Sequence, residues 1–240
     1  MKIAIFGDSI SEGIGSRKYN YAKELEKIMK SDDNNIEIYN YSYTGTTINY
    51  IFSLNEWKNI KFDLIIVAYG NVDGMLRPNL DKFPNFYKYL PKRYKKNGML
   101  NPRPYYSKKW YKSLFQHIDS FIRWNLNRFL LKFQGETTWV SLKEFENKYS
   151  KIMCDFSNIT NNIILLSTVK VSNKYFPNTN NSYVKYNEII KRIAEKYNCI
   201  YIDLFDQINE DEFYEDLFHP NQKGYIHIAN LLLEKIHIKH

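Results

Sequence analysis

The hydrophobic pattern of the chain begins with a short apolar run, residues 3–6, that stops at the turn Gly7-Asp8-Ser9. The run is too short and too rich in β-branched side chains for a helix, and it predicts a buried strand. Beyond the turn, apolar residues recur at helical spacing over residues 17–30. This order of strand, sharp turn and helix places Ser9 at the carboxyl end of a first strand, where open α/β sheets bind their ligands.

The rest of the pattern alternates short apolar runs with longer segments of helical period. The strongest apolar run, residues 62–68, is almost unbroken, as in a central parallel strand that is buried on both faces. Such alternation predicts a parallel sheet with helices on both faces and right-handed crossovers, an α/β fold of three layers. The predicted strands are residues 3–6, 36–39, 62–68, 163–167 and 199–202, and the later helices are residues 142–156, 183–197 and a last one after His219.

Residues 75–140 interrupt this alternation and carry most of the unusual composition. They hold 14 Lys and Arg against 3 Asp and Glu, whereas the other residues hold 20 basic and 23 acidic side chains. The formal net charge of +8 therefore comes entirely from this segment, which also contains 15 of the 40 aromatic residues and five of the seven prolines. We expect a proline-punctuated lobe followed by one amphipathic helix over residues 113–133. The apolar residues expected to face inward are Leu114, Phe115, Ile118, Phe121 and Ile122.

Length and composition fit a single domain, residues 1–240, with residues 75–140 as an inserted lobe. No apolar stretch approaches the roughly 20 residues that cross a bilayer. Because the chain begins almost directly with a predicted strand, we expect no secretory leader and a cytoplasmic location. Cys154 and Cys199 are expected to be small buried side chains, and no metal or other cofactor is expected.

Candidate chemistry appears near the far end of the chain, where Asp216 and His219 stand just before the last helical pattern. An Asp three residues before a His lets the carboxylate reach one imidazole nitrogen and leaves the other free to act as a base. A serine becomes a useful nucleophile only when such a base lies within hydrogen-bond reach. The sheet would have to bring Ser9 and His219 together. Asp8 and Asp73 are expected to shape their turns.

Gly-Asp-Ser after the first strand together with Asp-x-x-His before the last helix resembles the SGNH/GDSL hydrolase family. The resemblance covers the chain apart from its middle segment. It implies that Ser9 attacks an ester carbonyl, that His219 takes the serine proton and that Asp216 orients the imidazole. It also implies the flavodoxin-like strand order 2-1-3-4-5.

The same resemblance implies an oxyanion hole formed by the N–H groups of Ser9 and Gly45 and by an asparagine amide. The family pattern for that asparagine is Gly-x-Asn-Asp. In this chain Val72 occupies the asparagine position, and Asn71 stands one place early. We take Asn71 as the donor; the alternative is a hole built from backbone N–H groups alone.

The resemblance further implies an esterase that removes an O-acyl group, expected to be acetyl, from a carbohydrate. The positive charge and the aromatic rings of residues 75–140 suit a bacterial surface polysaccharide or its lipid- or nucleotide-linked precursor. The basic, aromatic segment has three interpretations: a solvated lobe, a surface for an acidic glycan, or a nucleic-acid surface. The family favours the glycan over nucleic acid. We expect residues 75–140 to form a lid or wall over the site, with Arg77, Arg103 and Trp110 as candidate substrate-binding residues.

Two alternatives to an esterase stay open at this point. The departure at Val72 leaves room for a glycan-binding or assembly protein that keeps the fold without the activity, and an O-acyltransferase could use the same serine. Nucleotide binding by residues 7–15 is disfavoured, because neither Gly-x-Gly-x-x-Gly nor a P-loop lysine is present. Neither the sugar nor the oligomeric state follows from the sequence.

Overall fold

The computed structural model describes residues 1–14, 19–32, 35–79, 89, 91, 107–213 and 217–237. Its centre is a five-stranded sheet in the order β2-β1-β3-β6-β7, in which every neighbouring pair is parallel. This is the order that the family resemblance implies. The strands are β1 (Lys2–Gly7), β2 (Glu37–Ser42), β3 (Leu64–Ala68), β6 (Ile163–Leu166) and β7 (Ile200–Ile202).

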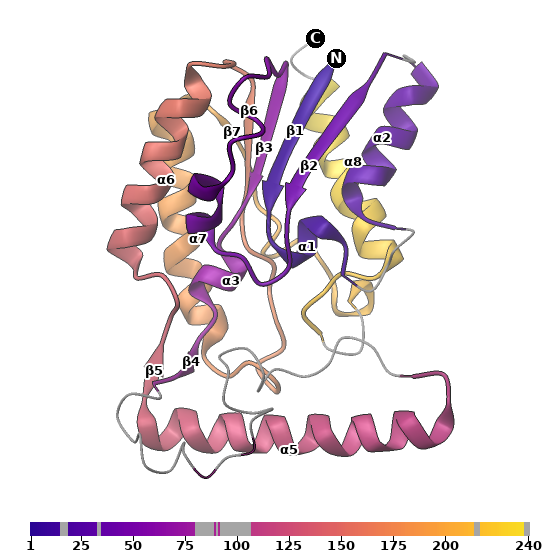
Figure 1. Cartoon of the computed structure of the whole chain (residues 1–240), viewed down its shortest axis with the longest axis vertical. Helices are drawn as coiled ribbons and strands as arrows, with labels where there is room; N and C mark the ends of the chain where they lie inside the picture. The colour runs from indigo at the N-terminus through magenta and orange to yellow at the C-terminus, as the bar shows by residue number, and fades with distance from the viewer. Residues whose placement is uncertain are drawn as a thin grey trace.

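Helices cover both faces of the sheet, which confirms the predicted three-layer α/β fold (Figure 1). Side chains of β1 alternate between two cores, because successive strand residues point to opposite faces. Ile3 and Ile5 contribute to the core under α2 and α8, whereas Ala4 and Phe6 contribute to the core under α6 and α7. The covering helices are α2 (Tyr21–Asp32), α6 (Leu142–Ser157), α7 (Thr179–Lys196) and α8 (Gln222–His237).

Short helical segments follow three of the strands and were not predicted from the pattern. They are α1 (Ser9–Glu12), the 3₁₀ helix η1 (Ile48–Ser53) and α3 (Asn71–Gly74), and a second 3₁₀ helix, η4 (Glu210–Glu212), precedes the last helix. Because α1 follows β1 directly, the helix predicted from residue 17 begins only at Tyr21. These single turns are too short to show a period in the sequence.

Helix α5 (Trp110–Gln134) lies beyond the carboxyl ends of the strands, across one end of the molecule (Figure 1). The predicted helix exists, but the prediction of its inward face was wrong. The five apolar residues expected inside are exposed: Leu114 by 53%, Phe115 by 70%, Ile118 by 48%, Phe121 by 63% and Ile122 by 42%. Helical period identifies an apolar face without identifying what lies against it, and here the protein packs against the opposite, largely polar face.

Two short strands close the segment that interrupts the α/β pattern. β4 (Arg77–Pro78) and β5 (Glu136–Thr137) pair in antiparallel fashion, so the chain leaves and returns at one place. Much of the first half of the segment, including Arg103, lies outside the described residues.

The expectation of two buried cysteines was wrong. Cys154 is exposed on α6 and Cys199, just before β7, is partly exposed; neither is in a disulfide. A helical pattern predicts burial only for the residues in its apolar stripe. Cys154 lies beside that stripe rather than in it. Within the described ranges, no helix combines the length and the apolar character needed to cross a membrane.

Candidate active site

Ser9 and His219 meet at the edge of the sheet although 210 positions separate them in sequence. The Oγ atom of Ser9 lies 2.9 Å from Nε2 of His219. Ser9 is the first residue of α1, directly after β1, and His219 lies in the turn before α8. Both side chains are buried, with exposed fractions of 4% and 9%. The structure therefore brings the predicted serine and its predicted histidine base within hydrogen-bond reach of each other.

The turn that carries His219 is fixed on both sides of the histidine. Phe213 and Pro220 form an isolated antiparallel bridge across it. Leu217 has a φ of 49°, which a leucine rarely adopts, and its carbonyl accepts a hydrogen bond from the N–H of Ser172 at 3.4 Å. Asp216, the predicted third member of the site, lies outside the described residues, so its role stays a prediction.

Gly45 stands in the loop after β2, the strand that neighbours β1. Its φ of 71° lies in the left-handed region that glycine adopts at little cost. A Cβ placed there would meet no atom within 4 Å, so the backbone rather than a lack of space requires glycine at this position. The loop lies at the same edge of the sheet as Ser9. The role of the Ser9 and Gly45 N–H groups as oxyanion donors is compatible with this position and stays a prediction.

Asn71 opens α3 and is held at both ends. Its side-chain Oδ1 accepts a hydrogen bond from the N–H of Val169 at 2.9 Å, and its carbonyl accepts one from the hydroxyl of Tyr183 at 2.7 Å. These bonds fix the side-chain amide. Burial raises the pKa of the Asp8 carboxyl group, and the interaction of that group with the Asn71 amide opposes the rise. Val72 is buried beside it, with 4% of its surface exposed. The role of Asn71 as an oxyanion donor stays a prediction.

Two buried aspartates support the turns at this edge, as the sequence led us to expect. Asp8 caps α1, because its Oδ1 accepts a hydrogen bond from the N–H of Ile10 at 3.0 Å. Asp73 accepts from the N–H groups of Ile48 and Gly70 at 2.9 and 3.1 Å, and so ties η1 to the start of α3. What the sequence did not reveal is how deeply these carboxyl groups are buried beside the candidate catalytic pair.

Burial dominates the ionisation of both groups. Loss of hydration raises the pKa of Asp8 to about 6, and the nearby His219 acts in the opposite direction. Burial likewise raises the pKa of Asp73 to about 7, and the charge of Asp8 adds to the rise. Above its pKa Asp8 carries a negative charge near His219, the side chain predicted to accept the serine proton.

The replacement Asp8→Asn is expected to gain stability relative to the wild type as the pH rises. The pKa of Asp8 is about 6 in the folded protein, against an ordinary value of 3.8. At a pH between these two values the folded state holds a proton that the unfolded chain has released. The contribution of Asp8 to the free energy of unfolding therefore falls as the pH rises through this window. Asparagine keeps an acceptor for Ile10 and does not titrate.

Urea denaturation of both proteins at about pH 4 and about pH 7.5 measures this difference, because most of the window between the two pKa values lies between these two pH values. The free energy of unfolding of the variant minus that of the wild type should increase by on the order of 1–3 kcal/mol between them. A difference that does not change with pH would contradict the raised pKa of the buried Asp8.

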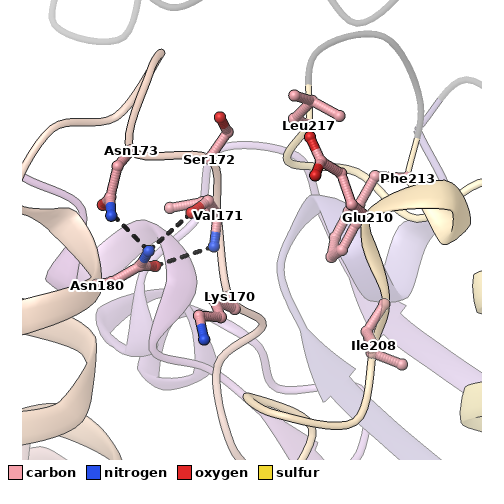
Figure 2. Close-up of a pocket in the computed structure, with 9 residues that line it drawn as sticks. All are labelled: Lys170, Val171, Ser172, Asn173, Asn180, Ile208, Glu210, Phe213 and Leu217. Carbon is pink, nitrogen blue, oxygen red and sulfur yellow. Dashed lines mark hydrogen bonds between the residues drawn. The ribbon is translucent and has the colours of Figure 1, made fainter.

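A pocket of about 270 Å³ lies beside the turn that carries His219. One wall is the loop after β6, in which the N–H and the carbonyl of Val171 bond to the side-chain amide of Asn180 on α7, at 2.9 and 2.7 Å. The facing wall carries Phe213 and Leu217, and Figure 2 shows the two walls with open space between them. The size is near the lower end of small-molecule sites, which span roughly 300–1,000 Å³. The pocket could receive part of a substrate whose ester lies at Ser9.

Of the predicted substrate-binding residues, Arg77 and Trp110 are described. Arg77 is 5% exposed; its Nη1 donates to the carbonyls of Val72 and Met75 at 3.0 and 2.9 Å, and its guanidinium stacks on Trp139 at 3.5 Å from the ring centroid. The structure therefore places Arg77 as a support for the loop that carries Asn71. Trp110, at the start of α5, is 78% exposed. Substrate contacts of either residue stay predictions.

Comparison with known proteins supports the same chemistry. A model of the GDSL-like lipase/acylhydrolase family matches residues 5–226. Among curated proteins, a multidomain esterase from Ruminococcus flavefaciens is 39% identical over 62 residues, which make up 25% of this chain and only 8% of that protein.

Solved structures extend the similarity over almost the whole chain. An acetylxylan esterase from Geobacillus stearothermophilus superposes with a TM-score of 0.61 at 16% identity, covering 98% of this chain and 93% of its own. An α/β hydrolase from the metagenome of Lake Arreo also gives a TM-score of 0.61 at 16% identity, covering 97% of this chain and 93% of its own. At such identities the likeness establishes a shared fold.

Proposed function

Since the chain belongs to the GDSL-like lipase/acylhydrolase family and is a serine esterase of the SGNH type, we propose that it removes O-acetyl groups from a carbohydrate. The observation that carries the proposal is the contact of 2.9 Å between Ser9 Oγ and His219 Nε2. Acyl transfer to a serine needs that contact and a place for the developing oxyanion.

In the proposed mechanism, Ser9 Oγ attacks the acetyl carbonyl while His219 accepts the serine proton. The negative charge that develops on the carbonyl oxygen is stabilised by the N–H groups of Ser9 and Gly45 and by the amide of Asn71. The tetrahedral intermediate collapses when the imidazolium gives its proton to the sugar oxygen, which leaves as a hydroxyl and leaves Ser9 acetylated. Water, deprotonated by His219, then attacks this ester and releases acetate and the free serine.

Asp216 is proposed to hold the histidine in the tautomer that this sequence of steps requires. Mutants of the acetylxylan esterase from Geobacillus stearothermophilus that are described as catalytic change a serine, an aspartate and a histidine, and the aspartate precedes the histidine by three residues. Asp216 and His219 have the same spacing and the same order after the serine. The proposal for Asp216 rests on this spacing and on the position of His219.

The carbohydrate part of the proposal rests on the similar structures and on the charge of residues 75–140. The acetylxylan esterase acts on an acetylated sugar polymer, as its name states, and its fold covers 98% of this chain. The net positive charge of residues 75–140 favours an anionic substrate, because a cationic surface raises the local concentration of anions. We therefore propose an acidic bacterial surface polysaccharide, or its precursor in the cytoplasm, as the natural substrate class.

Release of acetate from chemically acetylated oligosaccharides tests the proposal. A neutral xylo-oligosaccharide and a uronate-containing oligosaccharide should both be deacetylated, and the uronate substrate should have the higher kcat/KM at low salt. This advantage should disappear when the ionic strength approaches about 1 M, where the Debye length is only about 3 Å. Release of acetate from p-nitrophenyl acetate but from neither sugar would contradict a carbohydrate substrate. Acetyl groups that move to an added sugar acceptor would instead identify an acyltransferase.

A further inference from the structure

Helix α5 turns its apolar face outward. Nine large apolar residues of this 25-residue helix are exposed by 42% or more. Isolated exposed apolar side chains are common, but a contiguous stripe along a helix marks an interaction surface. We name this stripe the outer face of α5. Its apolar members are Trp110, Tyr111, Leu114, Phe115, Ile118, Phe121, Ile122, Phe129 and Phe133.

The opposite face of α5 is attached to the protein mainly through polar groups. Asp119, Arg123 and Asn127 are buried there, and the Nε of Arg123 donates to Oδ2 of Asp119 at 2.7 Å. Trp124 stacks on Tyr175, in the loop after β6, with ring centroids 3.8 Å apart. The helix is thus anchored by specific contacts on its inner side, so the outward position of its apolar side chains follows from its packing.

Charge distinguishes among the partners that could cover the outer face. The exposed charged residues from position 108 to the end of α5 are all basic: Lys108, Lys109, Lys112, Arg128 and Lys132. The helix has one acidic residue, Asp119, and it is buried against Arg123. The exposed side of α5 therefore combines large apolar side chains with positive charge alone.

A second copy of the chain fits this surface poorly, because an isologous contact would bring two like-charged faces together. A nucleic acid would neutralise the lysines but leave most of the aliphatic side chains uncovered. An anionic lipid bilayer supplies both an apolar layer and negative headgroups, and in-plane amphipathic helices that bind such membranes have this combination of aromatic, aliphatic and basic residues.

We propose that the outer face of α5 binds the surface of an anionic membrane, with the helix axis in the membrane plane. The polar inner face stays attached to the protein. Because α5 lies beyond the carboxyl ends of the strands, the end of the molecule that carries Ser9 faces the membrane (Figure 1). This inference concerns binding alone, and it does not rest on the proposed substrate.

Cosedimentation of the full chain with vesicles tests the proposal. Vesicles of phosphatidylcholine with added phosphatidylglycerol should bind the protein, and vesicles of phosphatidylcholine alone should bind it at least about tenfold more weakly. Fluorescence from Trp110, the tryptophan on the outer face, should shift to shorter wavelength on binding. Phe115→Ser and Phe121→Ser should each reduce partitioning by roughly tenfold, since each removes a large apolar group from the bilayer. The double charge reversal Arg128→Glu and Lys132→Glu should remove the preference for anionic lipid.

Val184→Ser is the matched control, because Val184 is 44% exposed and belongs to α7 rather than to the outer face of α5, so its replacement should leave binding unchanged. Circular dichroism checks that every variant is folded. Equal binding to both kinds of vesicle, or wild-type binding by the phenylalanine variants, would overturn the proposal. So would a stable dimer in sedimentation equilibrium that Phe115→Ser dissociates, because the outer face would then be an interface between copies.

Discussion

Replacement of Ser9 by alanine is expected to lower kcat for p-nitrophenyl acetate by on the order of 10⁴-fold or more, because it removes the nucleophile. Replacement of His219 by alanine should have a similar effect, since the two side chains act as one unit across a contact of 2.9 Å. For the same reason the double replacement should be little worse than either single one. Initial rates at saturating ester, with purified proteins, provide the measurement.

Ser31→Ala is a suitable control for these variants. Ser31 is exposed on α2, and its hydroxyl donates to the carbonyl of Ile28 in its own helix, at 2.6 Å. Its replacement should leave kcat unchanged. Turnover by Ser9→Ala at the wild-type rate would show that another group attacks the ester. Effects of Ser9→Ala and His219→Ala that multiply in the double variant would show that the two residues act independently.

Replacement of Asn71 by alanine is expected to lower kcat by on the order of 10²-fold with little change in KM, if its amide is one of the oxyanion donors. The same change removes the acceptor for the N–H of Val169, so it should also reduce the free energy of unfolding by about 1–3 kcal/mol. The two effects must be separated before the loss of rate is assigned to the oxyanion.

Asn187→Ala separates them. Asn187, on α7, accepts a hydrogen bond from the N–H of Thr168 at 2.9 Å, which is the same bond at the same length on the neighbouring residue. Its replacement should reduce stability to a similar extent and leave kcat near the wild-type value. Equal losses of kcat in the Asn71 and Asn187 variants would mean that Asn71 acts by positioning the loop. A kcat of Asn71→Ala within about twofold of the wild type would mean that backbone groups stabilise the oxyanion alone.

Much of the fold could be predicted because the apolar pattern that specifies each strand and helix lies within a short stretch of sequence. Each central strand is a short apolar run that ends in a turn, and a parallel sheet with crossovers on both faces is the arrangement that buries such runs. The strand order came from the resemblance rather than from the pattern. The boundaries that moved, as at the start of α2, lie next to single helical turns whose capping bonds, such as that from Ile10 to Asp8, cannot be recognised from spacing.

The side of α5 that packs against the protein could not be predicted, because an amphipathic period identifies an apolar face but does not show whether that face lies inside or outside. Leu114 and Phe115 look like core residues until the polar groups on the other side are found to pack against the protein. The surroundings of Arg77 could not be predicted for a different reason: β5 and Trp139, which pack against it, lie about 60 residues away in sequence. Its role toward a substrate anion stays a prediction.

The site itself was predicted in outline from Ser9 and His219, since each stands at a turn that follows or precedes a strongly patterned element. Its supporting residues were harder to recognise. The contribution of Asp8 depends on burial and on its distance from His219, and the orientation of Asn71 depends on a bond to Val169, which is 98 residues away in sequence. Such properties arise only when separate segments pack together.

The central claim is that His219 activates Ser9 as the nucleophile of an esterase. Reaction with a fluorophosphonate, followed by peptide mass spectrometry, tests this claim directly, because the reagent forms a stable adduct only with a serine that is activated in this way. We predict a single adduct on Ser9 that forms at a much lower rate in His219→Ala. No adduct, or an adduct on another residue in a protein that still hydrolyses esters, would contradict the account.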